Sequence, residues 1–186
     1  AGDCSIPPLG RVFDQSGNLC GFITPLETSL VFPSRLEATT LPSNLYSPAS
    51  RRTLIHELCT LVTRLHSKGV IHGDIKPTNL LRCSDGKLRF CDFECAAIEG
   101  ENAPITRFTD EYASPSTNNW KPTTVLSFAD DLYSTGISIW EIYTGLIPFQ
   151  EVKGFSTDIV AAGVRPDISK IDDSEVADLV LSYLDR

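Results

Sequence analysis

Apolar residues between positions 54 and 65 recur every three or four residues, which is the spacing of one face of an α-helix. The face is formed by Leu54, Ile55, Leu58, Leu61, Val62 and Leu65. Ser47 or Ser50 is suited to cap the start of this helix, and Gly69 has the position expected of a C-cap glycine. The pattern therefore predicts a helix that begins near residue 50 and packs one face against a core.

A second helix is predicted over residues 127–144, where apolar side chains fall on most sides. Gly145 ends this helix, and Pro148 follows within the next turn. Such a segment is expected to be buried on most sides. Shorter amphipathic patterns predict two further helices near residues 155–163 and 173–184.

β-Prone residues form short runs that are separated by turn-forming clusters. Residues 11–25 predict a hairpin whose turn is the polar stretch 14–18. Residues 80–82 and 88–90 predict two short strands joined by a turn that contains the Asp85-Gly86 pair, which is a strong hairpin signal.

Two long stretches lack any periodicity. Residues 26–49 and 96–126 are rich in turn-forming and small polar residues, and both are expected to be mostly loop. A long loop inside a compact domain is usually functional or disordered. The order of hairpin, helix, strand hairpin, loop and then helices alone predicts a single α+β, mainly helical domain over residues 1–186.

The chain is acidic, with a net charge of −8. Nucleic acid and membrane surfaces are therefore not expected as partners, because both are recognised by basic surfaces. No apolar run is long enough to cross a bilayer and no signal-peptide pattern is present, so we expect a cytoplasmic protein. The sequence contains no Met, so Ala1 is not expected to be a native translation start.

The six cysteines include no Cys-x-x-Cys pair, and no histidine has the spacing of a zinc site. We expect free thiols that pack as small buried hydrophobes. Disulfides formed in an oxidising compartment are the alternative.

Four polar residues on predicted loops have the chemistry of a phosphotransfer site. Asp74, Lys76 and Asn79 lie between a helix and a strand, and Asp92 directly follows the second strand of the next hairpin. Because a hairpin brings its two ends together, Asn79 and Asp92 are expected to converge. An amide oxygen and a carboxylate suit Mg²⁺. Asp74 could orient or deprotonate a hydroxyl and Lys76 could neutralise a phosphate, which is most of what phosphoryl transfer requires.

The motifs around these residues resemble those of eukaryotic protein kinases. His72-Gly73-Asp74-Ile75-Lys76-Pro77-Thr78-Asn79 is similar to their catalytic loop, and Asp92-Phe93-Glu94 is similar to their Asp-Phe-Gly metal loop. Residues 112–116 look like the end of their activation segment, and residues 130–149 look like their central buried helix. The match keeps a consistent order from about residue 11 to residue 186.

The resemblance implies catalytic and cofactor-binding roles for the four polar residues. Asp74 would be the catalytic base, and Lys76 would contact the transferred phosphate. Asn79 and Asp92 would be the Mg²⁺ ligands, so that Lys76, Asn79 and Asp92 together would bind Mg-ATP. A protein is the implied substrate or partner.

Three further residues would have structural roles in such a kinase. Asp131 would anchor the backbone of the catalytic loop near His72. The rings of His72 and Phe93 would stack in the core.

The resemblance also implies a layout for the domain. Residues 11–25 would be a remnant hairpin of the small lobe that leads into the hinge, and residues 50–186 would be the large lobe. Within the large lobe, residues 72–79 would be the catalytic loop, 92–94 the metal loop and 92–116 the activation segment.

A related family competes for this interpretation. Small-molecule kinases of the aminoglycoside and choline type also use His-Gly-Asp and Asp-Phe-Glu tripeptides. The Lys76-Pro77 pair and the pattern over residues 131–145 instead match protein kinases, and these longer features favour the protein kinase family.

Parts of a protein kinase nucleotide site are not found in the sequence. There is no Gly-x-Gly-x-x-Gly loop and no Val-Ala-x-Lys strand. Gly73 replaces the arginine of His-Arg-Asp, Glu94 replaces the glycine of Asp-Phe-Gly, and Ser116 replaces the glutamate of Ala-Pro-Glu.

We therefore expect little or no phosphotransfer from these 186 residues. The first interpretation is a natural minimal pseudokinase that works by binding a protein. The second is a fragment of an active Ser/Thr protein kinase, which the intact Asp74, Lys76, Asn79 and Asp92 favour.

Overall fold

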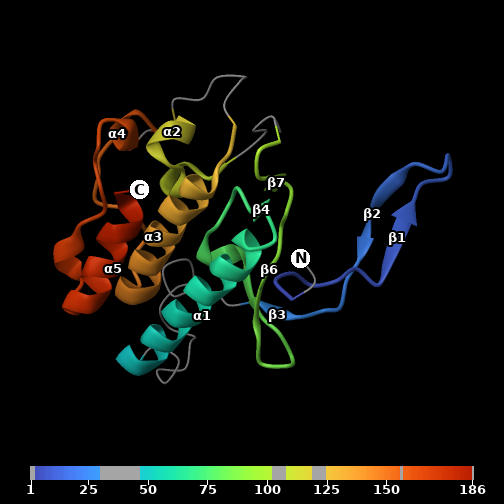
Figure 1. Cartoon of the computed structure of the whole chain (residues 1–186), viewed down its shortest axis with the longest axis horizontal. Coiled ribbons are helices and arrows are strands. Elements are labelled where there is room, and N and C mark those ends of the chain that lie inside the picture. The colour runs from blue at the N-terminus through green and yellow to red at the C-terminus, as the bar shows by residue number, and fades with distance from the viewer. Residues whose placement is uncertain (1–2, 30–46, 102–107, 119–124, 156, 186) are drawn as a thin grey trace.

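The computed structural model describes residues 3–29, 47–101, 108–118, 125–155 and 157–185. Its helices are α1 (Pro48–His66), α2 (Pro115–Asn118), α3 (Phe128–Thr144), α4 (Thr157–Ala161) and α5 (Ser174–Leu184), with 3₁₀ turns η3 (Pro77–Asn79), η4 (Asp110–Tyr112) and η5 (Ile168–Lys170). Its strands are β1 (Gly10–Phe13), β2 (Leu19–Ile23), β3 (Thr28–Ser29), β4 (Val70–Ile71), β5 (Leu80–Arg82), β6 (Leu88–Phe90) and β7 (Ala97–Ile98). Figure 1 shows α1, α3 and α5 next to one another and the β1–β2 hairpin projecting away from them.

Helix α1 has the start and the buried face that the sequence predicts. Ser47 is its N-cap, and the Ser47 hydroxyl accepts a hydrogen bond from the Ser50 backbone N–H at 3.2 Å. The apolar face packs against α3 and is buried at Ile55, Leu58, Leu61, Val62 and Leu65. The helix ends at His66 and its C-cap is Ser67, so the expectation that Gly69 is the cap was wrong. Gly69 instead forms the turn into β4, with a φ of +71°.

Helix α3 is the centre of the core, with α1 and α5 both packed against it. Thirteen of its residues are buried, as its all-round apolar pattern predicts. Gly136 allows α5 to approach closely, because a Cβ at this position would lie 2.9 Å from the Cβ of Tyr183. Any larger residue at position 136 would therefore separate α3 from α5.

Short antiparallel sheets lie beside the helices. Strands β3, β5 and β6 form one sheet in that order, and β4 pairs with β7. The N-terminal segment joins the first sheet, because the Phe90 N–H donates to the Cys4 carbonyl at 2.8 Å. The Cys4 side chain is fully buried. The sheets place the ends of β4 and β6 next to the start of α3. The polar motifs over residues 72–79 and 92–94 follow these two strands.

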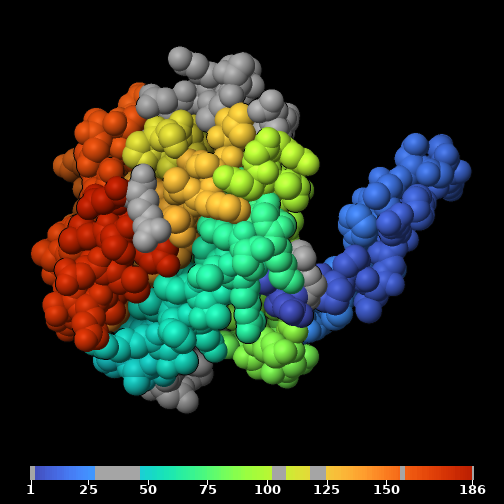
Figure 2. Space-filling model, in the orientation of Figure 1, coloured from blue at the N-terminus to red at the C-terminus, as the bar shows by residue number. Residues whose placement is uncertain are grey.

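The β1–β2 hairpin confirms the turn that was predicted over residues 14–18. One carboxylate oxygen of Asp14 accepts backbone hydrogen bonds from Ser16 and Asn18, each at 2.8 Å. Both strands carry exposed apolar side chains, and Phe22 and Ile23 are more than half exposed. Figure 2 shows this hairpin standing apart from the rest of the molecule.

The fold is α+β, as expected, but the predicted loop over residues 96–126 contains more structure than its sequence suggests. Strand β7, the turn η4 and the short helix α2 all lie within it. Residues 102–107 and 119–124 of this stretch, and 30–46 of the earlier predicted loop, lie outside the described residues. The helix expected near 155–163 is shorter, at Thr157–Ala161.

All six cysteines fall within the described ranges and are free thiols. Cys4 and Cys83 are buried as expected, whereas Cys20 is exposed on the hairpin. Among the described helices, none is both long and apolar enough to cross a membrane.

Candidate active site

The loop after β4 is held in place by a buried carboxylate on α3. Asp131 accepts hydrogen bonds from the backbone N–H groups of His72 at 2.8 Å and Gly73 at 2.9 Å. The Nε2 atom of His66 lies 2.9 Å from the same carboxylate. Asp131 is only 1% exposed, so these bonds are made away from water and fix the backbone from which Asp74 projects.

Gly73 is the point at which this loop passes closest to the chain beyond β6. Its φ is +78°, and a Cβ at this position would lie 2.4 Å from the Cys95 carbonyl oxygen. A glycine is required here both by the left-handed conformation and by the lack of space. The arginine of the His-Arg-Asp motif would not fit at position 73 without a backbone shift.

The buried ring of His72 connects the loop to the segment that precedes Asp92. Its Nε2 atom donates to the Cys91 carbonyl at 3.0 Å, and its Nδ1 atom accepts from the Asp74 N–H at 3.3 Å. These two bonds define the neutral Nε2–H tautomer. Burial lowers the pKa of His72, which agrees with a neutral ring. The ring also packs against Phe93 in a tilted arrangement, with 4.7 Å between centroids.

The side chains of Lys76 and Asn79 converge on Asp74. The Lys76 ammonium lies 2.5 Å from Oδ2 of Asp74. The Asn79 amide nitrogen donates to the Asp74 backbone carbonyl at 2.9 Å and to Oδ2 at 3.1 Å. The Lys76 and Asn79 side chains therefore both contact the Asp74 carboxylate.

Thr109 completes this cluster and was missed by the sequence analysis. Its hydroxyl donates to Oδ1 of Asp74 at 2.7 Å and accepts from the Lys76 ammonium at 2.7 Å. The available signal was its position three residues before residues 112–116, which resemble the end of an activation segment. A threonine in a polar loop is too common to be selected on that basis alone.

The surroundings of Asp74 favour its ionised form. Burial acts to raise the pKa of Asp74, but the hydrogen bonds from Lys76 and Thr109 outweigh this effect, and the net result is a lowered pKa. Asp74 is therefore a carboxylate near neutral pH, in the state required to accept a hydrogen bond or a proton.

Asn79 and Asp92 are brought together by the β5–β6 hairpin. The backbone N–H of Cys91, directly before Asp92, donates to the Asn79 carbonyl at 3.0 Å. Asp92 has a φ of +58°, a conformation that few non-glycine residues adopt and that is common at functional sites. The hydrogen bonds of Asn79 use its amide nitrogen, so its amide oxygen and the exposed Asp92 carboxylate supply two hard oxygen donors. This donor set fits Mg²⁺.

The described residues contain no group of three His, Cys, Asp or Glu side chains that could hold a metal by themselves. A magnesium ion at Asn79 and Asp92 would therefore take its other ligands from phosphate and water, which is usual for Mg²⁺.

A cavity of about 580 Å³ opens beside Asp92. It is lined on one side by the N-terminal segment, Phe22 and residues 24–27, and on the other by Leu81 and residues 90–93. Residues 24–27 are tied to the β5–β6 turn, because Glu27 accepts from the Ser84 N–H at 2.7 Å. The volume is within the range of small-molecule sites, and the wall is mainly apolar.

The segment after Thr109 is fixed to α3 by a second buried carboxylate. Asp130 accepts hydrogen bonds from the Ser116 hydroxyl at 2.6 Å and from the Ser127 backbone N–H at 2.8 Å. Ser114 and Thr117 also donate to it. A cluster of hydroxyl groups around Asp130 therefore surrounds position 116, where the resemblance would place a glutamate.

A carboxylate held by a lysine and a hydroxyl lies beside two oxygen donors and a cavity of small-molecule size, and these are components that phosphoryl transfer uses. The chain belongs to the protein kinase domain family, which matches residues 26–180.

Three relatives with similar sequences are named as serine/threonine-protein kinases. "Serine/threonine-protein kinase STY46" of Arabidopsis thaliana is 28% identical over 128 residues, which cover 67% of this chain and 22% of the relative. "CBL-interacting serine/threonine-protein kinase 8" of the same plant is 32% identical over 109 residues, covering 57% and 24%. "Serine/threonine-protein kinase stk11" of Xenopus laevis is 35% identical over 91 residues, covering 46% and 21%. The matched regions thus span about a fifth to a quarter of these relatives.

Proposed function

We propose that residues 1–186 form a protein-kinase-like domain that binds Mg-ATP and a protein but transfers phosphate slowly or not at all. In this proposal the domain is descended from Ser/Thr protein kinases and acts as a pseudokinase-type binding module. The cavity beside Asp92 is the observation that carries the proposed nucleotide binding.

The cluster around Asp74 is suited to receive a Ser or Thr hydroxyl. A substrate hydroxyl placed at Asp74 would donate to the carboxylate, which would orient the hydroxyl oxygen for attack on a phosphoryl group. The Lys76 ammonium is close enough to Asp74 to neutralise negative charge on the phosphoryl group that the hydroxyl would attack. Thr109 is hydrogen-bonded to both side chains, so it holds the Asp74 carboxylate and the Lys76 ammonium next to each other.

The cavity beside Asp92 is the proposed nucleotide site. Its apolar wall at Phe22 and Leu81 suits a flat base, and Asp92 lies at the same cavity for the phosphates. A magnesium ion held there by Asn79 and Asp92 would neutralise phosphate charge. In this assignment residues 11–25 are a remnant of the small lobe and residues 50–186 are the large lobe.

The proposed loss of activity rests on the protein groups that would contact the terminal phosphate of ATP. No Gly-x-Gly-x-x-Gly loop is encoded in the sequence, and its first lysine is Lys68, in the turn after α1. Among the described residues that contact Asp74, Lys76 is the basic side chain placed to neutralise the transferred group. In related phosphotransfer sites, an additional arginine that stabilises the transition-state charge is worth a factor of about 10³ or more in rate.

Transfer of labelled phosphate from ATP tests this proposal. Purified residues 1–186 are incubated with γ-labelled ATP, Mg²⁺ and a mixture of protein substrates, alongside the Asp74→Asn variant. We expect no labelling above the variant. Labelling of this chain or of a substrate that Asp74→Asn abolishes would show an active kinase instead.

The alternative is that these residues are part of an active Ser/Thr protein kinase. The complete Asp74, Lys76 and Thr109 cluster favours this alternative, because an inactive site has no need of it. It predicts that a longer reading frame containing this chain phosphorylates protein, and that Asp74→Asn in that longer protein removes the activity.

A further inference from the structure

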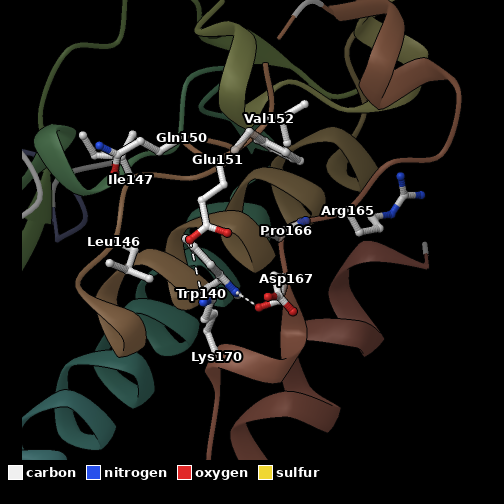
Figure 3. Close-up of a pocket in the computed structure, with 11 residues that line it drawn as sticks. Trp140, Leu146, Ile147, Gln150, Glu151, Val152, Arg165, Pro166, Asp167 and Lys170 are labelled. Atoms are coloured by element: carbon white, nitrogen blue, oxygen red, sulfur yellow. Dashed lines mark hydrogen bonds and ion pairs between the residues drawn. The ribbon is translucent and has the colours of Figure 1, made fainter. Parts of the chain in front are cut away.

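A second cavity, of about 140 Å³, lies at the C-terminal end of α3. Figure 3 shows its lining residues, which come from α3, from the loop that follows α3 and from the segment around η5. None of them belongs to the catalytic loop or to the nucleotide cavity. Apolar contact is provided by Trp140, Ile147, Phe149, Val152 and Pro166.

The apolar part of this cavity is built from fixed side chains. Trp140 is 3% exposed, and its indole N–H donates to the Asp167 carbonyl at 2.9 Å. Phe149 is 5% exposed and stacks on Phe155 with 4.9 Å between centroids. The first contact joins α3 to the segment around η5, and the second fixes Phe149 within the loop that follows α3. A ligand would therefore meet a preformed surface, which lowers the entropic cost of binding.

The mouth of the cavity carries one weak ion pair. Glu151 and Lys170 approach each other across it at 3.7 Å, and their side chains are 74% and 41% exposed. Figure 3 shows the Glu151 carboxylate pointing towards Trp140 and Lys170. Exposed pairs at such a distance contribute little to stability, so either charge can change partner at small cost.

Two other charged side chains at the cavity are already engaged. The Asp167 carboxylate accepts from the Ser169 N–H at 3.0 Å and from its hydroxyl at 2.7 Å. The Arg165 guanidinium lies over the Tyr133 ring, 5.4 Å from its centroid. Glu151 is therefore the carboxylate that a ligand at this mouth can reach most easily.

We propose that this cavity binds the aromatic side chain of a protein segment in which a Lys or Arg is adjacent to the aromatic residue. The volume is close to that of the cavity, about 150 Å³, known to accept a benzene ring. Trp140 and Phe149 supply aromatic surfaces for stacking. The basic neighbour would pair with Glu151, and the net charge of −8 favours the approach of a basic segment. The site works independently of phosphotransfer.

The indole N–H signal of Trp140 in an NMR titration tests the site. The sequence has two tryptophans, so a Trp120→Phe background leaves Trp140 as the sole indole reporter. Three capped peptides of equal length are compared, with Lys-Phe-Lys, Glu-Phe-Glu or Lys-Ala-Lys at the centre. We expect a saturable shift with the first peptide and none with the third. The Glu-Phe-Glu peptide should bind about two- to fivefold more weakly than the first, the size of one exposed charge contact.

Two variants separate the pocket from general attraction to an acidic surface. Glu151→Lys changes an exposed residue and should reverse the order of the Lys- and Glu-flanked peptides. Val152→Phe should fill the cavity and abolish the indole shift, provided that its melting curve shows a folded protein. The proposal is overturned if Lys-Ala-Lys shifts the indole as much as Lys-Phe-Lys, if no peptide shifts it, or if Glu151→Lys leaves the order unchanged.

Discussion

At Gly73 the backbone passes so close to Cys95 that the side chain at this position decides whether the loop can form. The φ of +78° alone disfavours any other residue, and the space for a Cβ is occupied by the Cys95 carbonyl. Gly69 has a similar φ of +71° but no atom within 4 Å of its Cβ position. A comparison of substitutions at the two glycines therefore distinguishes the cost of backbone strain from the cost of steric conflict.

Gly73→Ala is expected to destabilise the protein more than Gly69→Ala. Gly69→Ala should cost about 1–2 kcal/mol, the strain of a left-handed alanine. Gly73→Ala should cost about 3 kcal/mol or more, because overpacking adds to that strain. Urea unfolding of the two variants measures the difference. Equal losses of unfolding free energy would mean that the contact with Cys95 is not a constraint.

The lowered pKa of Asp74 predicts a pH dependence that Lys76 controls. A carboxyl group whose pKa is lower in the folded state adds stability above its unfolded value, near 3.8, and this stability is lost as the pH falls through the folded pKa. Removing the ammonium in Lys76→Met should raise the pKa of Asp74 and weaken this acid dependence.

Carboxyl ¹³C titration by NMR measures the pKa of Asp74 in the two proteins. The matched control is Lys153→Met, which removes a charge from an exposed site and should leave the pKa of Asp74 in place. An unchanged titration in Lys76→Met would show that the contact between Lys76 and Asp74 does not set the ionisation.

Some residues of the candidate site could be identified from the sequence, and others could not. Asp74, Lys76 and Asn79 lie within six positions, so their spacing and chemistry identify them together. Thr109 contacts Asp74 from 35 positions away, and no local pattern marks that contact. The fit at Gly73 depends on the path of the chain near Cys95, which only the tertiary structure defines.

Among the helices and strands, those long enough to show an apolar period were the easiest to predict from the sequence. Helices α1, α3 and α5 have 19, 17 and 11 residues, enough for an apolar period to be visible. Strand β7 and helix α2 have two and four residues, too few for any period, and both were assigned to loop. The backbone pairing of the N-terminal segment with β6 was missed for the same reason.

Helix α3 is also the element that connects the core to the loop over residues 72–79, through Asp131. Asp131→Ala would leave the buried N–H groups of His72 and Gly73 without their acceptor. We expect a loss of about 2–4 kcal/mol in unfolding free energy, since each unpaired buried donor costs about 1–3 kcal/mol. The control is Asp178→Ala on the exposed side of α5, which should stay within about 0.5 kcal/mol. Urea unfolding that gave equal effects for both variants would contradict this anchoring role.

For the whole molecule, α3 separates two sites. Its first turn holds the loop over residues 72–79 through Asp131, and its last turns contribute Trp140 to the cavity at its C-terminal end. Family membership and the α+β fold could be read from sequence because the motifs keep their order along the chain. The second cavity could not, because its lining comes from three segments without a common motif.

The central claim is that this chain binds nucleotide through magnesium at Asp92. The most direct measurement is the melting temperature of residues 1–186 with ATP alone and with Mg-ATP, for the wild type and for Asp92→Asn. Ligand at ten times its Kd should stabilise the fold by about 1.4 kcal/mol, a rise of about 3–5 °C for a domain of this size. We predict this rise for wild type with Mg-ATP, and its loss with ATP alone or in Asp92→Asn. No rise at millimolar Mg-ATP, or an equal rise in Asp92→Asn, would contradict the claim.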